Sequence, residues 1–568
     1  MYFCQNYKNM VGMKKKMVDF KNEIKRLLQG KLKNMPSLEV PPRADLGDYA
    51  LPCFTLAKEL RKVPQQIAKD LAESIKPNKL IIKAIAVGPY VNFFINKEAL
   101  ADNVITQIIK EKDKHGKEKP HGKTVAIDLS SPNIAKPFGV GHLRSTVIGN
   151  AIANLYSATG YKSVKINHIG DWGTQFGKLI TAYKRWGKEK DLKKEPIKAL
   201  LSLYVRFHKK NNEKLETEAR AWFKELETGN REALRLWKQF KNLSLKEFNK
   251  IYKELNIKFD SIEGEAFYND KMEPIAKMLE ERKLLEEDQG AKIVRLEDLP
   301  PALIKKSDST TLYITRDLAA IMHREKKYKP AQLIYVVGSE QTLHFKQLFR
   351  IAEMLGMKTK AVHVPFGLFF LPEGKMATRE GKVIFLEDVI NETVRLAKET
   401  IEEKNPKLKN KDKIAKEVAI GAIIFWDLSH DRVRDVLFDI KKVLDFEGET
   451  GPYVQYTHAR ANSILAKAKK RAKADHAKMV TPEEHKVLTL LAEYKPAIED
   501  SARQYKPSIL AKYLLTLAQA FNEFYHARNC LKEPDAGLRN ARLELVAATA
   551  QVLKNGLAIL GITAPKEM

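Results

Sequence analysis

One short stretch of the chain combines residue types that rarely serve packing alone. Residues 132–150 read PNIAKPFGVGHLRSTVIGN, and they follow an apolar run at 124–130. Glycines there let a ligand approach the backbone. His142 would lie in the first turn of the following helix, where an imidazole and free N–H groups can bind phosphate oxygens. The stretch predicts a phosphate-binding turn between a strand and a helix. A glycine-rich turn with a histidine cap is the alternative.

Strands and helices alternate through the middle of the chain. We expect strands at 124–130, 162–170, 310–315, 333–338 and 361–370, with amphipathic helices between them. Such alternation predicts an α/β fold with a Rossmann-type, doubly wound parallel sheet. Ligands bind such sheets at the carboxyl ends of the strands, which is where the glycine-rich stretch lies.

Changes in composition along the chain predict three domains. Residues 1–112 read as an N-terminal α+β domain, which ends in a polar linker. Residues 120–410 carry the alternating pattern, and a charged, helical insertion interrupts it at about 187–260. Residues 411–568 have almost no strand signal and predict an all-α C-terminal domain.

Positive charge is spread over the whole chain, whose formal net charge is +29. Residues 1–110 hold 19 Lys and Arg against 10 Asp and Glu, and residues 451–568 hold 18 against 11. Contacts between several domains and a large polyanion, most plausibly a nucleic acid, would explain this distribution. A generally lysine-rich composition is the alternative.

Several classes of protein are disfavoured by the sequence. No apolar run approaches the roughly 18 residues that a membrane span needs. The first residues lack the pattern of a secretory signal. Cys4, Cys53 and Cys530 lie far apart, which excludes a CxxC metal site and favours a reducing compartment. We therefore expect a cytoplasmic protein that binds neither a membrane nor a structural metal.

Several segments, in order along nearly the whole chain, resemble the arginyl-tRNA synthetase family, which belongs to the class I aminoacyl-tRNA synthetases. The first is SSPNIAKPFGVGHLRST (130–146), which is similar to the HIGH motif. The others are HIGDWGTQFG (168–177), LYITRDLAA (312–320), VVGSEQTLHFKQ (336–347), GKMATREGKVIFLEDV (374–389) and FEGETGPYVQYTHAR (446–460). GDYALPCFTLAKEL, VGPYVNFFIN and the final LGITAPKEM resemble the terminal domains.

This resemblance implies an arginine–tRNA ligase that acts in translation. Such an enzyme joins L-arginine to the α-phosphate of ATP, releases pyrophosphate, and transfers the arginyl group to the 3′ end of tRNA(Arg) with release of AMP. ATP is a substrate, and we expect Mg²⁺ on the ATP and no metal bound by the protein itself. The N-terminal domain would contact tRNA and the C-terminal domain would bind the anticodon. We expect a monomer.

The resemblance also assigns residues to the nucleotide site. The HIGH-like motif covers Pro132, Asn133, Ile134, Ala135, Lys136, Pro137, Phe138, Gly139, Val140, Gly141 and His142. Catalytic roles fall to His142, Lys136 and Lys375, and ATP would contact Phe138, Gly139, Gly141, His142, Arg144, Lys375 and Met376. Two departures stand out. Gly139 replaces the first histidine of HIGH, and KMATR replaces KMSKS, with Ala377 in place of a hydroxyl residue.

The resemblance also assigns residues to arginine binding and to RNA contact. The arginine-binding residues would be Asp128, Asn133, His168, Tyr313, Asp317 and Gln341. The family often has Glu where this chain has Asp128, and His168 has a structural role at a strand end as its alternative. Tyr453, Tyr456, His458, Arg460 and Met568 are the candidates for RNA contact. Aromatic side chains three residues apart also suit a helix core.

Two other functions remain open at this point. The first is another class I synthetase or nucleotidyltransferase on the same fold, although Asp128 and Asp317 favour a cationic substrate. The second is a non-catalytic RNA-binding relative, which only Gly139 and Ala377 support. Exchange of pyrophosphate into ATP with arginine and tRNA distinguishes these possibilities.

Overall fold

The computed structural model describes residues 20–32, 36–39, 41, 43–305, 313–370, 385–468 and 473–568. Contacts between residues divide the chain into two compact units. One unit comprises residues 1–115, 457–494 and 516–555, and the other comprises residues 116–456, 495–515 and 556–568. The helical C-terminal part of the chain therefore contributes to both units, and the three sequence domains stay a prediction.

A four-stranded parallel sheet lies at the centre of the second unit, with the strand order β10-β9-β4-β5. The strands are β4 (Thr124–Asp128), β5 (Lys162–Ile166), β9 (Gln332–Gly338) and β10 (Lys360–Phe366). Each is rich in apolar and β-branched residues, and β4 and β9 are almost wholly buried. The α/β class predicted from the alternating pattern is confirmed.

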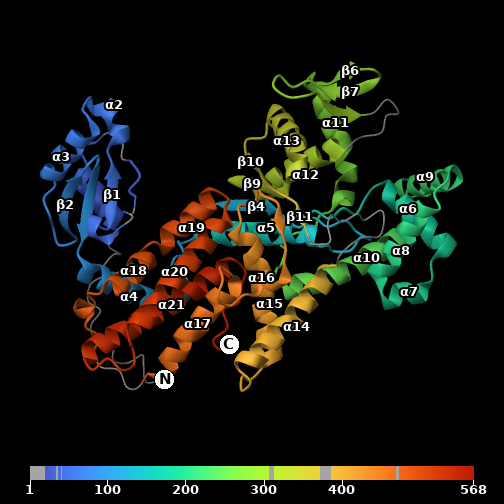
Figure 1. Cartoon of the computed structure of the whole chain (residues 1–568). Coiled ribbons are helices and arrows are strands. Elements are labelled where there is room, and N and C mark those ends of the chain that lie inside the picture. Colours follow the sequence, from blue (N-terminus) through green and yellow to red (C-terminus); the bar gives the residue numbers. More distant parts are fainter. Residues whose placement is uncertain are drawn as a thin grey trace. The chain divides into compact units, whose positions relative to one another are not determined.

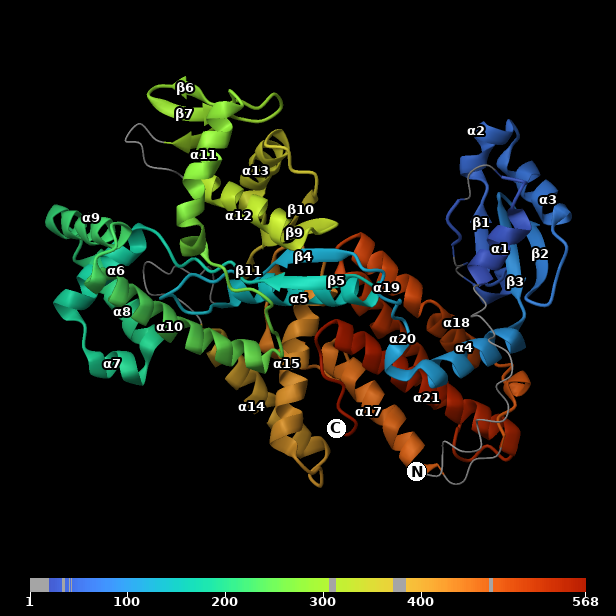
Figure 2. The same ribbon diagram turned by 180° about the vertical axis from the view of Figure 1, so that it is seen from behind.

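Helices cover both faces of this sheet (Figures 1 and 2). Helix α5 (Val140–Ala158) crosses one face and packs against β4, β5 and β9. Helices α12 (Tyr313–Tyr328) and α13 (Thr342–Met354) cover the other face. There, Leu318 and Ile321 of α12 join a buried cluster with Ala126 and Leu333 of the sheet. This layering leaves the carboxyl ends of the strands free to form a site.

Helix α5 approaches the end of β4 unusually closely. A Cβ atom added at Gly149 would lie 2.4 Å from Cβ of Leu129, closer than real Cβ atoms come to other heavy atoms. Interiors are packed to crystal-like density, so the neighbouring backbone has little room to yield. Gly149 therefore fixes the distance between α5 and the strand that precedes the HIGH-like motif.

One predicted element differs from the structure. The residues at 310–315, TTLYIT, were expected to form a strand because β-branched and aromatic residues favour one. Helix α12 instead begins at Tyr313, and residues 306–312 lie outside the described residues. Ile314, Leu318 and Ile321 recur at helical spacing and are all buried. That spacing, and the surface on which it packs, outweighs local strand propensity.

The segment expected as a helical insertion consists of helices on the carboxyl side of the sheet (Figure 1). They are α7 (Glu189–Lys194), α8 (Pro196–Lys209), α9 (Glu213–Glu227) and α10 (Arg231–Glu254), and α6 (Thr174–Trp186) precedes them. Next come the 3₁₀ helix at Glu265–Lys271, α11 (Met272–Glu281) and an antiparallel sheet of β6 (Glu286–Asp288), β7 (Ala291–Val294) and β8 (Ala302–Lys305).

The remaining elements of the second unit follow β10. Strand β11 (Phe369–Phe370) pairs in parallel with β12 (Val436–Leu437). Helices α14 (Leu386–Lys404), α15 (Lys411–Ser429) and α16 (Ile440–Val443) precede α17 (Gly451–Lys467), which runs from this unit into the other. Helix α15 packs against α5. Helix α19 (Tyr494–Arg503) also belongs almost wholly to this unit.

The first unit contains an antiparallel sheet with the strand order β1-β3-β2. Its strands are β1 (Tyr49–Pro52), β2 (Ile81–Val87) and β3 (Tyr90–Ile95), and its helices are α1 (Phe20–Leu28), α2 (Ala57–Leu60), α3 (Pro64–Ser74), α4 (Lys97–Glu111) and α18 (Pro482–Ala492). It also holds much of α20 (Pro507–Ala527) and α21 (Ala536–Ile559). Within the described residues, no helix is long and apolar enough to cross a membrane.

The close packing at Gly149 leads to a prediction for stability. Alanine normally favours a helix over glycine by about 1 kcal/mol, whereas overpacking a core costs about 1–3 kcal/mol. We expect Gly149→Ala to lower the melting temperature measured by calorimetry. Gly141→Ala is the control, because that position in the same helix has open space around it. A Gly149→Ala protein as stable as the control would contradict this account of α5.

Candidate active site

The turn between β4 and α5 holds the HIGH-like motif in a strained backbone. Ser130, Ser131 and Ala135 have φ angles of 72°, 48° and 62°, in the left-handed region that side chains disfavour. Hydrogen bonds hold them there. The N–H of Ser130 donates to Oγ of Ser145 at 2.9 Å, and the N–H of Ala135 donates to Oγ of Ser244 at 3.0 Å. Strained backbone that its surroundings hold in this way is characteristic of functional sites.

The HIGH-like motif pairs with the segment at 168–177. The N–H of Gly170 donates to the carbonyl of Pro132, and the N–H of Ile134 donates to the carbonyl of Gly170, both at 3.1 Å. A Cβ at position 170 would lie 2.3 Å from Oδ1 of Asn133, so the glycine permits this approach. Two segments that the family resemblance singled out separately are therefore joined at the carboxyl edge of the sheet.

His142 lies in the first turn of α5 with a defined tautomer. The N–H of Gly139 donates to Nδ1 of His142 at 3.2 Å, which places the imidazole hydrogen on Nε2. Burial lowers the pKa of His142 to about 4, and the charge of Lys136 adds to this effect. The side chain is therefore neutral at physiological pH. It presents one N–H donor beside the positive end of the helix.

The other residues of the motif surround this turn. Gly139 forms an isolated antiparallel bridge with Phe385, and its φ of −86° suits any residue. The ring of Phe138 is buried and lies 5.5 Å from the ring of Tyr252. Gly141 is exposed. The Nζ atom of Lys136 lies 6.0 Å from the ring centroid of Tyr204.

Of three further residues predicted to bind ATP, two lie outside the described residues and the third is buried. Lys375 and Met376, with Ala377 and the rest of 371–384, lie outside the described residues. Arg144 is fully buried, and its Nε donates to Oδ1 of Asp427 at 2.8 Å. Its Nη1 donates to the carbonyl oxygens of Gly367 and Arg434 at 2.7 and 2.9 Å. With no exposed surface, Arg144 does not reach a ligand in this arrangement, which differs from the expected role.

Five of the residues expected to bind arginine line a single cavity. They are Asp128, Asn133, His168, Asp317 and Gln341, and the cavity has a volume of about 420 Å³. It lies where β4 and β9 end, the edge at which parallel sheets bind ligands. Helix α12 begins at Tyr313, which puts positions 313 and 317 one turn apart on that helix. The side chain of Tyr313 lies outside the described residues.

Sequence reasoning missed several charged residues of this cavity, notably Glu265, Arg316, Arg324 and His344. His344 lies three residues beyond Gln341 at the start of α13, and Arg324 lies two turns beyond Asp317 on α12, so helical spacing could have indicated both. Glu265 begins a short 3₁₀ helix and follows no recognisable motif. No local pattern could have placed it beside Asp317.

The charges of the cavity are only partly neutralised within the protein. Oδ2 of Asp128 lies 2.7 Å from Nη1 of the buried Arg324. Nε2 of His344 and Oδ2 of Asp317 are 2.8 Å apart. Burial raises the pKa of Glu265 to about 7; the charge of Arg316, 4.0 Å away, opposes this shift, and the charge of Asp317 adds to it. Three carboxyl groups in one small cavity favour a cationic ligand, and a guanidinium can bind carboxylates through two parallel hydrogen bonds.

His168 contributes to the cavity as a neutral side chain. Its Nδ1 donates to the carbonyl of Glu263 at 3.0 Å, and burial lowers its pKa. Gln341 is exposed and lies at the rim, in a short 3₁₀ helix after β9. Among the described residues, no group of three or more His, Cys, Asp or Glu side chains is placed to hold a metal ion.

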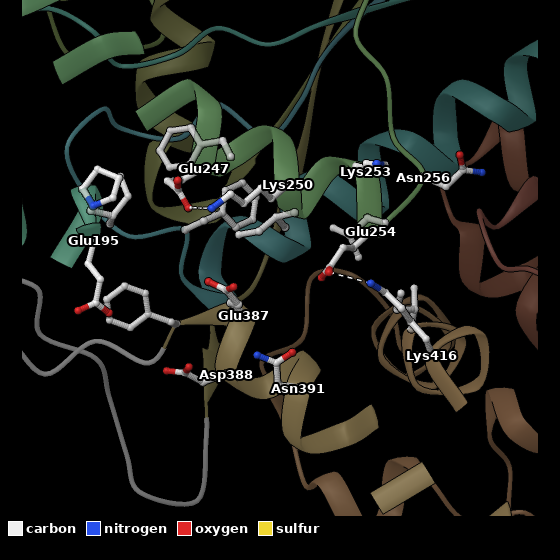
Figure 3. Close-up of a pocket in the computed structure, with 18 of the residues that line it drawn as sticks. Glu195, Glu247, Lys250, Lys253, Glu254, Asn256, Glu387, Asp388, Asn391 and Lys416 are labelled. Carbon is white, nitrogen blue, oxygen red and sulfur yellow. Dashed lines mark hydrogen bonds and ion pairs between the residues drawn. The ribbon is translucent and has the colours of Figure 1, made fainter. Parts of the chain in front are cut away.

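A larger cavity of about 820 Å³ lies between α10, α14 and α15 (Figure 3). Of the predicted site residues that the structure describes, Phe138 alone lines it. Its charged side chains are largely paired with one another, as in Lys250–Glu247 at 2.6 Å and Lys416–Glu254 at 2.8 Å (Figure 3). The smaller cavity, with its unbalanced carboxylates, therefore suits a charged amino acid better.

The predicted RNA-contact residues differ in their exposure. In α17, Tyr456 is exposed, Tyr453 and Arg460 are half-buried, and His458 is buried. Nη1 of Arg460 donates to Oδ1 of Asn522 at 2.5 Å. Met568 lies beside the end of α14, where Nδ2 of Asn405 donates to its carbonyl at 3.2 Å.

Comparisons with known proteins match nearly the whole chain. The family model for "tRNA synthetases class I (R), catalytic domain" matches residues 104–440, the arginyl tRNA synthetase N terminal domain matches 17–95, and the DALR anticodon binding domain matches 454–568. An arginine–tRNA ligase of Clostridioides difficile is 48% identical over 97% of this chain and 100% of its own length. The Enterococcus faecalis enzyme is 52% identical over 94% and 95%.

A solved structure shows the same architecture. The Thermus thermophilus arginyl-tRNA synthetase superposes with a TM-score of 0.86, at 28% identity, over 96% of this chain and 99% of that one. The parallel sheet, the HIGH-like turn at its first strand and the catalytic-domain match are those of a class I aminoacyl-tRNA synthetase. Within that class, the chain belongs to the arginyl-tRNA synthetase family. It activates arginine with ATP and joins it to tRNA, as the sequence predicted.

The environment of His142 leads to a prediction for its titration. A pKa of about 4 and a hydrogen bond accepted at Nδ1 should keep the ring neutral, with its hydrogen on Nε2, from pH 8 down to pH 5.5. Nitrogen-15 spectra of protein labelled at histidine measure both properties, and a His142→Gln protein identifies the signal. Titration of that signal with a midpoint near the usual 6.5 would contradict the prediction.

Proposed function

We propose that the cavity of about 420 Å³ holds the substrate arginine while His142 contacts the α-phosphate of ATP. The observation that carries this proposal is the convergence of Asp128, Asp317 and Glu265 on one cavity at the carboxyl edge of the sheet. Activation needs little covalent help from the protein. It needs the arginine carboxylate oriented in line with the α-phosphate, and donors for the charge that develops there.

The guanidinium of the substrate would lie between Asp317 and Glu265. Asp317 is half-buried and already bonded to His344, so its orientation is fixed before arginine enters. Glu265 has a pKa of about 7, and an arriving guanidinium would favour its ionised form. The two carboxyl groups would then receive the planar donors of the guanidinium. Tyr313, at the start of α12, remains a candidate for the same pocket.

The other end of the amino acid would face the turn after β4. We assign the ammonium and carboxylate groups of the substrate to Asn133, Gln341 and the region of Asp128. Arg324 holds Asp128 at 2.7 Å, so this carboxylate orients the site more than it supplies net charge. His168, neutral and bonded to a backbone carbonyl, would complete the wall.

ATP would bind over the first turn of α5. The Nε2–H of His142 is a neutral donor that the protein orients in advance, and such donors stabilise developing charge without reorganising. Gly139 leaves His142 without a second histidine, so Lys136 and, from the segment outside the described residues, Lys375 and Met376 would carry more of the phosphate contact. Mg²⁺ would arrive with ATP as part of the substrate.

Binding of tRNA(Arg) would use the two terminal domains, residues 1–112 and 411–568, beside the catalytic domain at 120–410. The spread of positive charge supports this assignment, because neutralised phosphates release counterions. Exposed Tyr456, with Tyr453, Arg460 and Met568, would contact the anticodon region. We propose that the enzyme acts as a monomer in the cytoplasm.

Substitution of Asp317 tests the arginine site. Asp317→Asn keeps the shape of the side chain but removes the charge that faces the guanidinium, and losing one partner of a desolvated charge pair costs about 2–5 kcal/mol. Because Asp317 is half-buried, we expect a cost at the low end of this range, about 2 kcal/mol. This cost corresponds to a rise of about 30-fold or more in the KM for arginine. The KM for ATP should change little in the pyrophosphate exchange assay, run with and without tRNA.

Asp298→Asn serves as the matched control, because Asp298 is an exposed carboxylate of the same unit outside the cavity. It should leave both KM values unchanged. A folded Asp317→Asn enzyme with the normal KM for arginine would place the guanidinium elsewhere.

A further inference from the structure

Arg144 is a fully buried charge two residues after His142. Its side chain is 1% exposed and that of Asp427, on α15, is 0% exposed. Removing an ion from water costs several kcal/mol, so a buried charge persists only with good partners. The guanidinium of Arg144 has such partners from three separate parts of the second unit. No nucleotide contact explains them.

The first set of partners lies on the chain between β10 and β11. Nη1 of Arg144 donates to the carbonyl of Gly367 at 2.7 Å, and the guanidinium carbon lies 5.8 Å from the ring centroid of Phe366. The second set lies just before β12. Nη1 also donates to the carbonyl of Arg434 at 2.9 Å, and Nη2 donates to that of Arg432 at 3.3 Å.

These two segments are also bonded to each other. The N–H of Gly367 donates to the carbonyl of Arg432 at 2.9 Å, and the N–H of Leu368 donates to Oδ1 of Asp435 at 2.6 Å. A Cβ at position 367 would lie 2.6 Å from the carbonyl of Arg434, so glycine permits the close approach of the two backbones. The guanidinium of Arg144 therefore binds one paired unit, which we call the β11–β12 pair (residues 366–370 and 432–437).

The third partner is Asp427. Its Oδ1 accepts from Nε of Arg144, and its Oδ2 has no hydrogen-bond partner among the described residues. Burial raises the pKa of Asp427, and the charge of Arg144 opposes that shift. The carboxylate therefore depends on Arg144 for its ionised form. This ion pair adds a charged link between α15 and the first turns of α5, which also pack against each other.

We propose that Arg144 is a positioning residue for the activation step, holding the first turn of α5, and with it Nε2 of His142, against the β11–β12 pair and α15. Residues 142 and 144 point to different sides of the helix, so one side can be anchored while the other faces the nucleotide. This inference rests on the proposed role of His142. It replaces the direct ATP contact that the sequence suggested for Arg144.

The geometry requires arginine at this position. A guanidinium presents several donors in a rigid plane and can bind carbonyls from two segments and a carboxylate at once. A lysine ammonium keeps the charge that Asp427 needs but reaches fewer of these acceptors. Arg144→Lys therefore loosens the anchoring without leaving the carboxylate unpaired.

A double-mutant cycle in the pyrophosphate exchange assay, at saturating tRNA, tests the proposal. We expect Arg144→Lys to lower kcat about 10-fold, because small displacements of a catalytic donor can cost up to about 100-fold. The KM for arginine should stay within about twofold, since the arginine cavity is not bound by Arg144. In a His142→Ala background, Arg144→Lys should lower kcat less than about twofold, because the donor that it positions is absent.

Two further variants keep the result interpretable. Arg542→Lys is the matched control, since Nε of Arg542 binds buried Glu484 at 2.7 Å in the other unit. It should lower the melting temperature and leave exchange kinetics unchanged. Asp427→Asn keeps the shape of the acceptor and replaces Arg144→Lys in the cycle if the lysine variant does not fold. It too should lower kcat in the native background and lower it less than about twofold in the His142→Ala background.

The outcomes separate the two claims. An equal loss of kcat in both backgrounds, or a normal kcat for Arg144→Lys, would overturn the positioning role while leaving His142 in place. A fully active His142→Ala enzyme would overturn the proposed role of His142 and this inference with it.

Discussion

Three carboxyl groups share one small cavity with two guanidinium groups, those of Arg316 and Arg324, so the arginines leave one negative charge without a cationic partner when all three are ionised. Asp128 is paired with Arg324 and Asp317 is bonded to His344, whereas Glu265 has a pKa near 7 in the absence of a ligand. An incoming guanidinium would relieve the repulsion between Glu265 and Asp317. In the proposed site, selectivity for arginine would follow from this excess negative charge, which an arginine side chain neutralises and a neutral amino acid of similar size does not.

Backbone geometry connects the proposed arginine cavity to the turn that we assign to ATP. Gly149 lets α5 lie close to the end of β4, the turn at 130–135 is held by hydroxyl acceptors, and Gly170 joins the HIGH-like motif to the next segment. His142 is neutral at one end of this arrangement and Arg144 is buried and charged two residues later. In the roles proposed for these two residues, a single helix turn supplies both the donor and its anchor.

The sequence predicted those parts of the site that depend on residues close to one another in the chain. The strands of the parallel sheet and the turn at 132–142 followed from apolar patterning and glycine chemistry, and the family resemblance identified Asp317 and Gln341. Tertiary packing decided the rest. The helix at 313–315 is favoured because Ile314 packs in the cluster against the sheet. Glu265 reaches the cavity from a segment without a motif, and Arg144 is buried among carbonyls 223 to 290 residues away along the chain.

Proton release on arginine binding tests the central claim most directly. Calorimetry of arginine binding near pH 6.5, in two buffers with different ionisation enthalpies, reports the number of protons exchanged. Because an arriving guanidinium lowers a pKa that is near 7 in the free enzyme, the account predicts proton release by the native protein and little or none by Glu265→Gln. Identical enthalpies in the two buffers for the native protein, or undiminished release by the variant, would contradict it.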